Sequence, residues 1–457
     1  LKIRLIKKIS NVIIKMASIN SIKRVEIYPS NRATANNTWS YKEGNPTLVF
    51  NFGVQDTYLL SNTLKLNFTL RVLDAAGARP NNDGQNGAAA SAILQNDKIG
   101  AMSCFQNITL SNALNQNLEY VRNYPRLLAS LIPARANFED YTTILGQQFG
   151  ATSNKQAQGM VNNHDIQVSA PLLCGLFLMG EPIPLGMNGT GGLQIKLQMS
   201  PSIESNFAAN AAGSYYQIVN PTLTCALGMP EGGQLPKIAG MPYLAYSNYY
   251  GVLNNGDETH NINCGLSSVL TTFSNFIPTT HIANNTEDGN ATPDLRNAPY
   301  AAADTAPISR YTSLRGGLKF PYQFTVDERR NISTNALGAF VSNFEAQLAR
   351  NFLSSISSPI KDLAQTLTGN ISEATQAAPD ATTAIQQNFN TAGENIIGVG
   401  SRYDQLGVGD GANFTNRSFS HRFQSGLNGV SPNSVYTFML GKNMITFNDN
   451  GGIAVTN

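Results

Sequence analysis

A two-residue alternation of apolar and polar side chains is the feature that most constrains how this chain can fold. Within residues 63–73, apolar side chains occupy every second position, namely Leu64, Leu66, Phe68, Leu70 and Val72. Successive side chains of a β-strand point to opposite faces, so this spacing predicts a strand with one buried and one solvated face. Residues 45–52, 104–110, 215–225 and 243–253 also read as strands.

The composition favours an all-β chain with more than one domain. A length of 457 residues exceeds what a single hydrophobic core normally serves. The 39 glycines and 21 prolines provide the frequent turns that many short strands need. Only 13% of the residues are charged, against about 25% in an ordinary soluble domain. Asn, Ser, Thr, Gln and Gly must therefore keep the surface hydrated.

The same plan of segments appears twice along the chain. Each half contains strands, a long polar loop, a helix-bearing insertion and closing strands. The long loops are predicted at 74–92, 281–306 and 361–394, and the helices at 118–131 and 337–356. Short strands joined by long loops favour jelly rolls over up-and-down barrels. We predict an N-terminal arm at 1–44, a first jelly roll at 45–230 and a second at 231–457.

The N-terminal end is basic, although the net charge of the whole chain is only +2. Seven basic residues precede the first acidic residue, Glu26: Lys2, Arg4, Lys7, Lys8, Lys15, Lys23 and Arg24. Clustered Lys and Arg attract phosphate without sequence specificity, so these residues are candidates for contact with DNA or with a membrane surface. A solvated or cleaved leader explains them equally well. Because Met16 resembles an ordinary start, residues 1–15 are either an upstream extension or a processed arm.

No pattern in the sequence indicates catalysis, a cofactor or a bound metal. The cysteines Cys104, Cys174, Cys225 and Cys264 lack metal-ligand spacing and are predicted to be buried free thiols, which fits a reducing compartment. His164, His260, His281 and His421 have no partner at i+3 or i+4 and are interpreted as loop residues. No GxSxG, HExxH or paired-carboxylate signature stands out. No apolar run reaches the roughly 18 residues of a transmembrane helix.

Three groups of segments resemble the major capsid proteins of virophages and Polinton-like viruses, which belong to the adenovirus–tectivirus lineage. The first is Val168-Ser-Ala-Pro-Leu-Leu-Cys-Gly-Leu-Phe with Ile183-Pro-Leu and Gly191-Gly-Leu-Gln-Ile-Lys-Leu-Gln-Met. The second is Cys104-Phe-Gln-Asn-Ile-Thr-Leu-Ser-Asn with Glu119-Tyr-Val-Arg-Asn-Tyr. The third is Pro432-Asn-Ser-Val-Tyr-Thr-Phe-Met with Ile445-Thr-Phe and Gly452-Ile-Ala-Val. Together these segments span most of residues 45–457.

The resemblance implies an all-β chain of two consecutive eight-stranded jelly rolls with long loops and a few short helices. It also implies a homotrimer that forms a pseudo-hexameric capsomer and tiles the shell of an icosahedral double-stranded DNA virus. Such a virion assembles inside the host cell. The expected partners are other copies of the chain, penton and minor capsid proteins, and packaged DNA or an inner membrane through the basic arm.

Two alternatives to the major capsid protein remain at this point. A carbohydrate-binding β-sandwich, such as a lectin or adhesin, would share the strands and the polar surface. A penton or minor capsid protein with one jelly roll would leave half of the chain unused. A polysaccharide-cleaving jelly-roll enzyme is less favoured, because it usually needs a row of exposed aromatic residues and the chain has a single tryptophan, Trp39.

Overall fold

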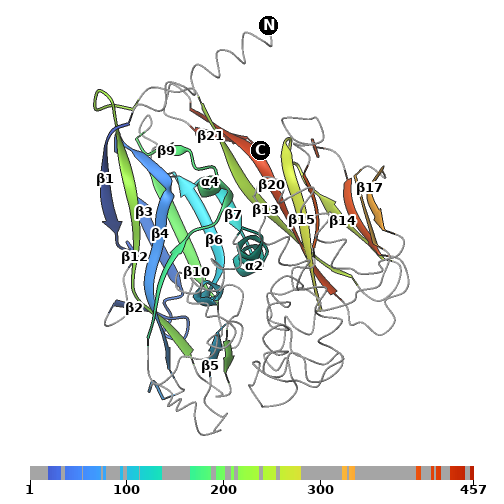
Figure 1. The fold of residues 1–457 in the computed structure, drawn as a ribbon, viewed down its shortest axis with the longest axis horizontal. Coiled ribbons are helices and arrows are strands. Elements are labelled where there is room, and N and C mark those ends of the chain that lie inside the picture. The colour runs from blue at the N-terminus through green and yellow to red at the C-terminus, as the bar shows by residue number, and fades with distance from the viewer. Residues whose placement is uncertain are drawn as a thin grey trace, which may run out of the picture.

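The computed structural model places the strands in two β-sandwiches that lie side by side (Figure 1). The described residues are 19–31, 37–53, 55–73, 76–78, 93–95, 100–112, 114–135, 165–186, 192–200, 207–209, 215–235, 240–253, 258–278, 322–326, 329–334, 398–402, 413–415, 418–423, 433–447 and 453–456. The predicted loops at 281–306 and 361–394, and the predicted helix at 337–356, lie outside these residues.

The first sandwich is built from eight main strands. They are β1 (Ile19–Ile27), β3 (Thr47–Phe52), β4 (Tyr58–Leu73), β6 (Phe105–Asn112), β7 (Asn117–Val121), β8 (Ile166–Pro171), β10 (Leu193–Met199) and β12 (Tyr215–Pro230). One sheet has the order β1-β12-β4-β8 and the other the order β3-β10-β6-β7, and every neighbouring pair is antiparallel.

Shorter elements decorate the first sandwich. They are β2 (Thr38–Trp39) beside β12, β9 (Pro182–Pro184) beside β4, the pair β5 (Ile93–Gln95) and β11 (Phe207–Ala209), the 3-10 helix η3 (Gly100–Cys104), and the helices α2 (Tyr124–Arg135) and α4 (Gly175–Leu178). Helices α2 and α4 lie on the side that faces the second sandwich (Figure 1).

The second sandwich repeats the arrangement of the first. Its strands are β13 (Gly240–Leu253), β14 (Glu258–Asn263), β15 (Val269–Pro278), β16 (Tyr322–Val326), β17 (Arg329–Thr334), β18 (Gly398–Arg402), β19 (Ser418–Phe423) and β20 (Asn433–Phe447), with β21 (Ile453–Thr456) beside β20. The sheet orders are β13-β20-β15-β18 and β14-β19-β16-β17. In both halves the first, eighth, third and sixth main strands form one sheet and the second, seventh, fourth and fifth form the other. This is jelly-roll topology, so the prediction of an all-β double jelly roll is confirmed.

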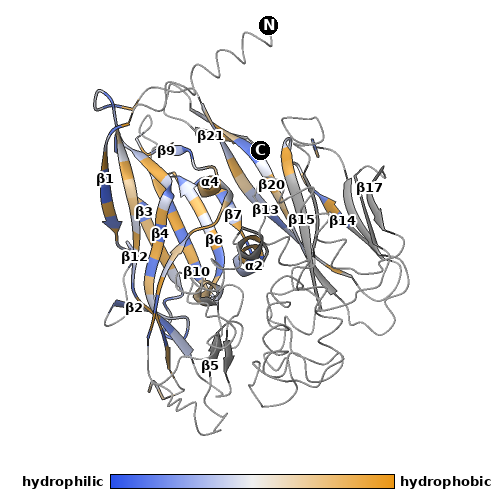
Figure 2. Cartoon of the chain, viewed as in Figure 1, coloured by the Kyte–Doolittle hydropathy of each residue, from blue (hydrophilic) through white to orange (hydrophobic). Residues whose placement is uncertain are grey.

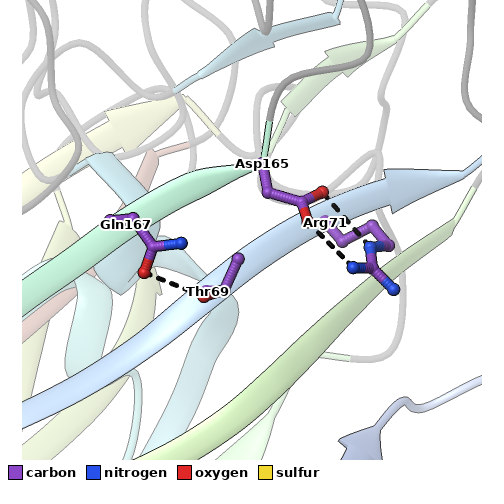
Figure 3. Close-up of polar contacts among 4 residues, drawn as sticks. All are labelled: Thr69, Arg71, Asp165 and Gln167. Carbon is purple, nitrogen blue, oxygen red and sulfur yellow. Dashed lines mark hydrogen bonds and ion pairs between the residues drawn. The ribbon is translucent and has the colours of Figure 1, made fainter. Parts of the chain in front are cut away.

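The two-residue alternation explains how β4 separates the core from the outer surface. Leu66 and Leu70 are fully buried, whereas Thr69 and Arg71 lie on the other face and bond to Gln167 on β8 and to Asp165 just before it. The hydroxyl of Thr69 donates to Gln167 at 2.9 Å, and Arg71 Nη2 lies 2.8 Å from Asp165 Oδ2 (Figure 3). Figure 2 shows alternating apolar and polar residues along several other strands of the first sandwich, β10 among them. The core therefore fills the space between sheets, and polar pairs cover the outer face.

Two details of the predicted elements are wrong. Residues 118–121 belong to strand β7, which pairs with β6, and the helix begins only at Tyr124. Leu127, Leu128 and Leu131 then give α2 its buried helical face, and Pro125 sits in the first turn, where its missing N–H costs little. Residues 175–178 form the short helix α4, which the sequence did not predict.

Two strands of the first sandwich lie within the segment predicted as an N-terminal arm. Within the predicted arm of residues 1–44, Ile19–Ile27 pairs with β12 from Pro230 to Leu223, and Thr38–Trp39 pairs with Val219 and Ile218. The sequence does not identify β1 as a strand, because most of its residues are exposed and only Val25 and Ile27 pack against the core.

Candidate assembly interface

The two jelly rolls are joined by a buried carboxylate on β7. Glu119 is only 3% exposed. Its Oε1 accepts hydrogen bonds from the backbone N–H of Gly175 at 2.8 Å and of Tyr246 at 2.9 Å, and its Oε2 accepts one from the N–H of Leu176 at 3.0 Å. Tyr246 belongs to β13 of the second jelly roll and the other donors to α4 of the first. One side chain therefore bonds both halves of the chain.

The surroundings of Glu119 act on its ionisation in opposite directions. Burial raises the pKa of Glu119 to about 7, while the hydrogen bonds from Tyr246, Leu176, Gly175 and the Cys174 side chain lower it. Burial also raises the pKa values of Cys174 and Tyr124 well above their ordinary values. The neutral thiol and phenol leave Glu119 as the group of this cluster that changes charge near neutral pH.

A close backbone approach and a second hydrogen bond between the two halves also belong to the junction. A Cβ on Gly175 would lie 2.7 Å from Ala245 Cα and from the Leu244 carbonyl, so only glycine allows α4 to approach β13 this closely. The hydroxyl of Tyr243 donates to the Leu118 carbonyl at 2.9 Å. A single hydrophobic cluster contains residues of both jelly rolls, from Trp39 in the first to Ile445 in the second. The two jelly rolls therefore pack on a shared core.

A third contact of the junction involves α2. The guanidinium carbon of Arg126 lies 5.3 Å from the ring centroid of Tyr436 on β20. Asn123 Nδ2 donates to Asn248 Oδ1 at 3.5 Å. These contacts place α2 against the second jelly roll, and a cation over an aromatic ring is favourable when both are shielded from water.

Strand β1 holds in the first jelly roll the place that β13 holds in the second, but most of its side chains are exposed. Among the described residues, no strand pairs with the outer edge of either β1 or β13. Ile22 is 64% exposed, and Met229, beside it on β12, is 44% exposed. At the corresponding place of the second jelly roll, Met241 is 6% exposed. The two positions correspond by strand register. Ile22 pairs with Gly228, two residues before the end of β12, and Met241 pairs with Ile445, two residues before the end of β20.

A hollow of about 390 Å³ opens where β1 ends and β2 begins. Here β12 changes its partner from β2 at Val219 to β1 at Leu223. The described lining residues with polar or aromatic side chains are Glu26, Tyr28, Asn31, Asn37, Trp39, Asn220 and Thr222. Glu26 is the only charged group among the described residues that line it. Asn37 and Asn220 adopt left-handed backbone conformations, with φ of 57° and 49°.

The basic residues singled out in the sequence fall into two groups. Lys23 and Arg24 lie on β1, opposite Leu227 and Ala226 of β12, and both are exposed. The other five lie outside the described residues: Lys2, Arg4, Lys7, Lys8 and Lys15. Their role in contacting DNA or a membrane therefore stays a prediction.

The four cysteines are free and buried, which confirms the prediction made for them. Two of the histidines are not loop residues as predicted, because His260 on β14 is the direct cross-strand partner of His421 on β19. Helical spacing does not detect a pair of this kind. Within the described part of the chain, no three His, Cys, Asp or Glu side chains gather as metal ligands would, and no helix could cross a bilayer.

Sequence analysis alone does not predict the residues of the junction. Glu119 is a single acid between Leu118 and Tyr120, and the only signal in the sequence is that a charge interrupts an apolar segment. Its partners at Gly175 and Tyr246 are far away in the chain and are brought to it by the fold.

The topology and the shared core define a double jelly roll in which one chain supplies both sandwiches. No family model and no curated protein matches the sequence. Solved structures do match. A quasi-atomic model of the PBCV-1 virus capsid aligns with a TM-score of 0.58 and 9% identity over 96% of this chain and 98% of that one.

Two further capsid structures share the fold. The Faustovirus major capsid protein aligns with a TM-score of 0.56 and 10% identity over 94% of this chain and 90% of that one. The Sputnik virophage structure aligns with a TM-score of 0.50 and 10% identity over 96% of this chain and 89% of that one. The chain therefore has the double jelly-roll fold of these viral capsid proteins along nearly its whole length.

Proposed function

We propose that this chain is the major capsid protein of an icosahedral double-stranded DNA virus, with a structural role in the virion shell and no catalytic activity. The observation that carries the proposal is the junction, where two jelly rolls of the same topology are fixed side by side by Glu119, Gly175 and Tyr243. A rigid tile of this kind works through the area that it offers to other copies.

We propose that the chain forms a homotrimer in which the junction is repeated between copies. Within one chain, β13 of the second jelly roll covers β7 and α4 of the first. If β1 of another copy packs in the same way against the second jelly roll, the contact is head-to-tail, and such contacts close into a ring when the rotation allows it. A ring of three chains contains six jelly rolls and has a hexagonal outline. The exposed β1 is the surface that this ring would cover.

The low charge of the chain suits large contacts between copies, because the centres of stable interfaces are poor in charged residues. We include penton and minor capsid proteins among the partners of the assembled shell. The basic residues near the N-terminus are proposed to contact packaged DNA or an inner membrane, since their charge attracts phosphate without any need for sequence readout.

The oligomeric state of the purified protein tests this proposal. We expect size-exclusion chromatography with light scattering to give a mass three times that of the 49.2 kDa chain, and negative-stain images to show hexagonal particles. Monomers at all concentrations would contradict the proposal, and monomers that bind glycans would favour a lectin or adhesin instead.

A further inference from the structure

The contact between the two jelly rolls contains a buried carboxyl group that has no counter-charge. Glu119 is 3% exposed, and its backbone hydrogen bonds come from N–H groups of α4 on one side and of Tyr246 on the other. Among the described residues, no cation forms an ion pair with it. Arg126 of α2 lies over Tyr436 instead, and Lys442 of β20 is exposed. An ionised carboxylate that has lost its water without gaining a positive partner is costly, so ionisation opposes the contact.

Few titratable groups face Glu119 from the elements around it. Strand β6 and helix α4 contain none. Cys174 precedes α4, Tyr124 begins α2, and Tyr243 and Tyr246 lie on β13. Burial raises the pKa values of Cys174 and Tyr124 well above their ordinary values and that of Tyr243 to about 12. These thiol and phenol groups are neutral near pH 7, so a charge that appears in the junction there belongs to Glu119.

Helix α4 is the part of the junction that can move while the sheets stay intact. It is a single turn of four residues, Gly175–Leu178. Its contact with β13 depends on the close approach at Gly175, where a Cβ would lie 2.7 Å from the Leu244 carbonyl, and on the two N–H groups bound by Glu119. Cys174 stands immediately before the helix and is fully buried. A movement of α4 away from β13 would bring water to both the carboxyl group and the thiol.

We infer that the protonation of Glu119 controls a local opening of the junction, in which α4 stays against β13 while the carboxyl group is neutral and separates from it more often when the group is ionised. The pKa of Glu119 is about 7 in the closed junction, and water in the open junction returns it towards 4.5. Opening therefore becomes more frequent as pH rises from about 4.5 and levels off above about 7. The contact lies within one chain, so this inference holds or fails independently of the capsid role.

Thiol labelling of the full-length protein with N-ethylmaleimide tests the opening. Cys174 and Cys104 are both fully buried, and burial raises the pKa of each thiol, so neither reacts while it is covered. Cys104 lies in the first sandwich, where its carbonyl accepts a hydrogen bond from Tyr216, and its labelling reports unfolding of the sheets. We expect Cys174 to be labelled at least about tenfold faster than Cys104 at pH 8, because α4 opens without the sheets.

Glu119→Gln shows whether the carboxyl group controls the opening, because an amide has no charge to gain. The ratio of the Cys174 labelling rates in wild type and in Glu119→Gln cancels the effect of pH on the thiol itself. We expect this ratio to rise about tenfold from pH 6 to pH 8, given pKa values of about 7 in the closed and 4.5 in the open junction. Glu26→Gln is the matched control, since Glu26 is exposed, and its labelling should equal that of wild type.

Two results would overturn the inference. Equal labelling of Cys174 and Cys104 would mean that α4 leaves β13 only when the whole chain unfolds. A ratio that does not change with pH would mean that Glu119 does not control the opening. If circular dichroism shows that Glu119→Gln does not fold, hydrogen exchange in the wild type decides instead. The N–H groups of Gly175 and Leu176 should then lose about tenfold in protection from pH 6 to pH 8, and unchanged protection would refute the control by Glu119.

Discussion

Strands β13 and β1 occupy the same position in the two jelly rolls, but β13 packs against the other jelly roll whereas most side chains of β1 are exposed. Tyr243 on β13 is 1% exposed and bonded to β7, whereas Tyr28 at the end of β1 is 62% exposed. The topology is the same, so the difference comes from what lies alongside. The first jelly roll covers β13, whereas six of the nine side chains of β1 are exposed among the described residues.

The largest effect should follow from removing the carboxylate that holds β13 in place. Glu119→Ala leaves the N–H groups of Gly175, Leu176 and Tyr246 buried without their acceptor. Each such group costs about 1–3 kcal/mol, so we expect a loss of about 4 kcal/mol in the free energy of unfolding of the protomer. Urea denaturation followed by circular dichroism measures it.

The matched control for this change is Glu26→Ala on β1, because that carboxylate is exposed in the single chain. It should alter the free energy of unfolding by less than about 0.5 kcal/mol. Equal losses for the two variants would mean that Glu119 does not join the halves.

A slightly smaller effect is expected from pH. The pKa of Glu119 is about 7 in the folded protein and 4.5 ordinarily, so between these values the folded state binds a proton that the unfolded state does not. Its stabilising contribution is therefore complete below about pH 4.5 and is lost as pH rises through about 7. At about 1.4 kcal/mol per pKa unit, the change is on the order of 3 kcal/mol.

Glu119→Gln provides the reference for the pH measurement, because an amide does not titrate in this range. The difference in free energy of unfolding between wild type and Glu119→Gln should change between pH 5 and pH 8. The neighbours Cys174, Tyr124 and Tyr243 have pKa values raised by burial, so they stay neutral across this window. A constant difference would mean that Glu119 is already ionised at pH 5.

The third comparison uses corresponding apolar residues of the two strands. Met241→Ala removes a side chain that is 6% exposed and should cost the protomer about 2–3 kcal/mol. Ile22→Ala removes one that is 64% exposed and should cost less than about 0.5 kcal/mol in the same measurement. A large loss for Ile22→Ala in a dilute protomer would mean that its own chain already covers β1.

The sequence is informative about β4 and much less so about β1 and β7. The apolar positions of β4 repeat with a period of two, because one face of that strand is always in the core. The period is weak in β1, because its residues are mostly exposed. From its sequence, this strand was therefore predicted as part of a basic arm. In β7 the apolar residues around Glu119 are also compatible with a helix. The segment is a strand because it pairs with β6.

The junction was less accessible to sequence analysis than the fold. Glu119 joins the two halves through backbone N–H groups of α4 and β13. Almost every residue type has such a group, so the partners cannot be recognised from the sequence. The cross-strand pair of His260 and His421 is likewise set by the register of β14 and β19. Residues that act through backbone partners or through strand register leave no local pattern.

The smallest effect is expected from removing a single hydroxyl group from a tyrosine at each of the two strands. Tyr243→Phe removes the hydrogen bond to the Leu118 carbonyl and leaves that carbonyl buried. A hydrogen bond of this kind contributes about 1 kcal/mol, so we expect a loss of that size in the free energy of unfolding. Tyr28→Phe should be neutral in the protomer, because water replaces a partner at an exposed hydroxyl. If Tyr28→Phe changes trimer affinity while leaving the protomer unaltered, β1 gains from another copy the cover that β13 already has within the chain.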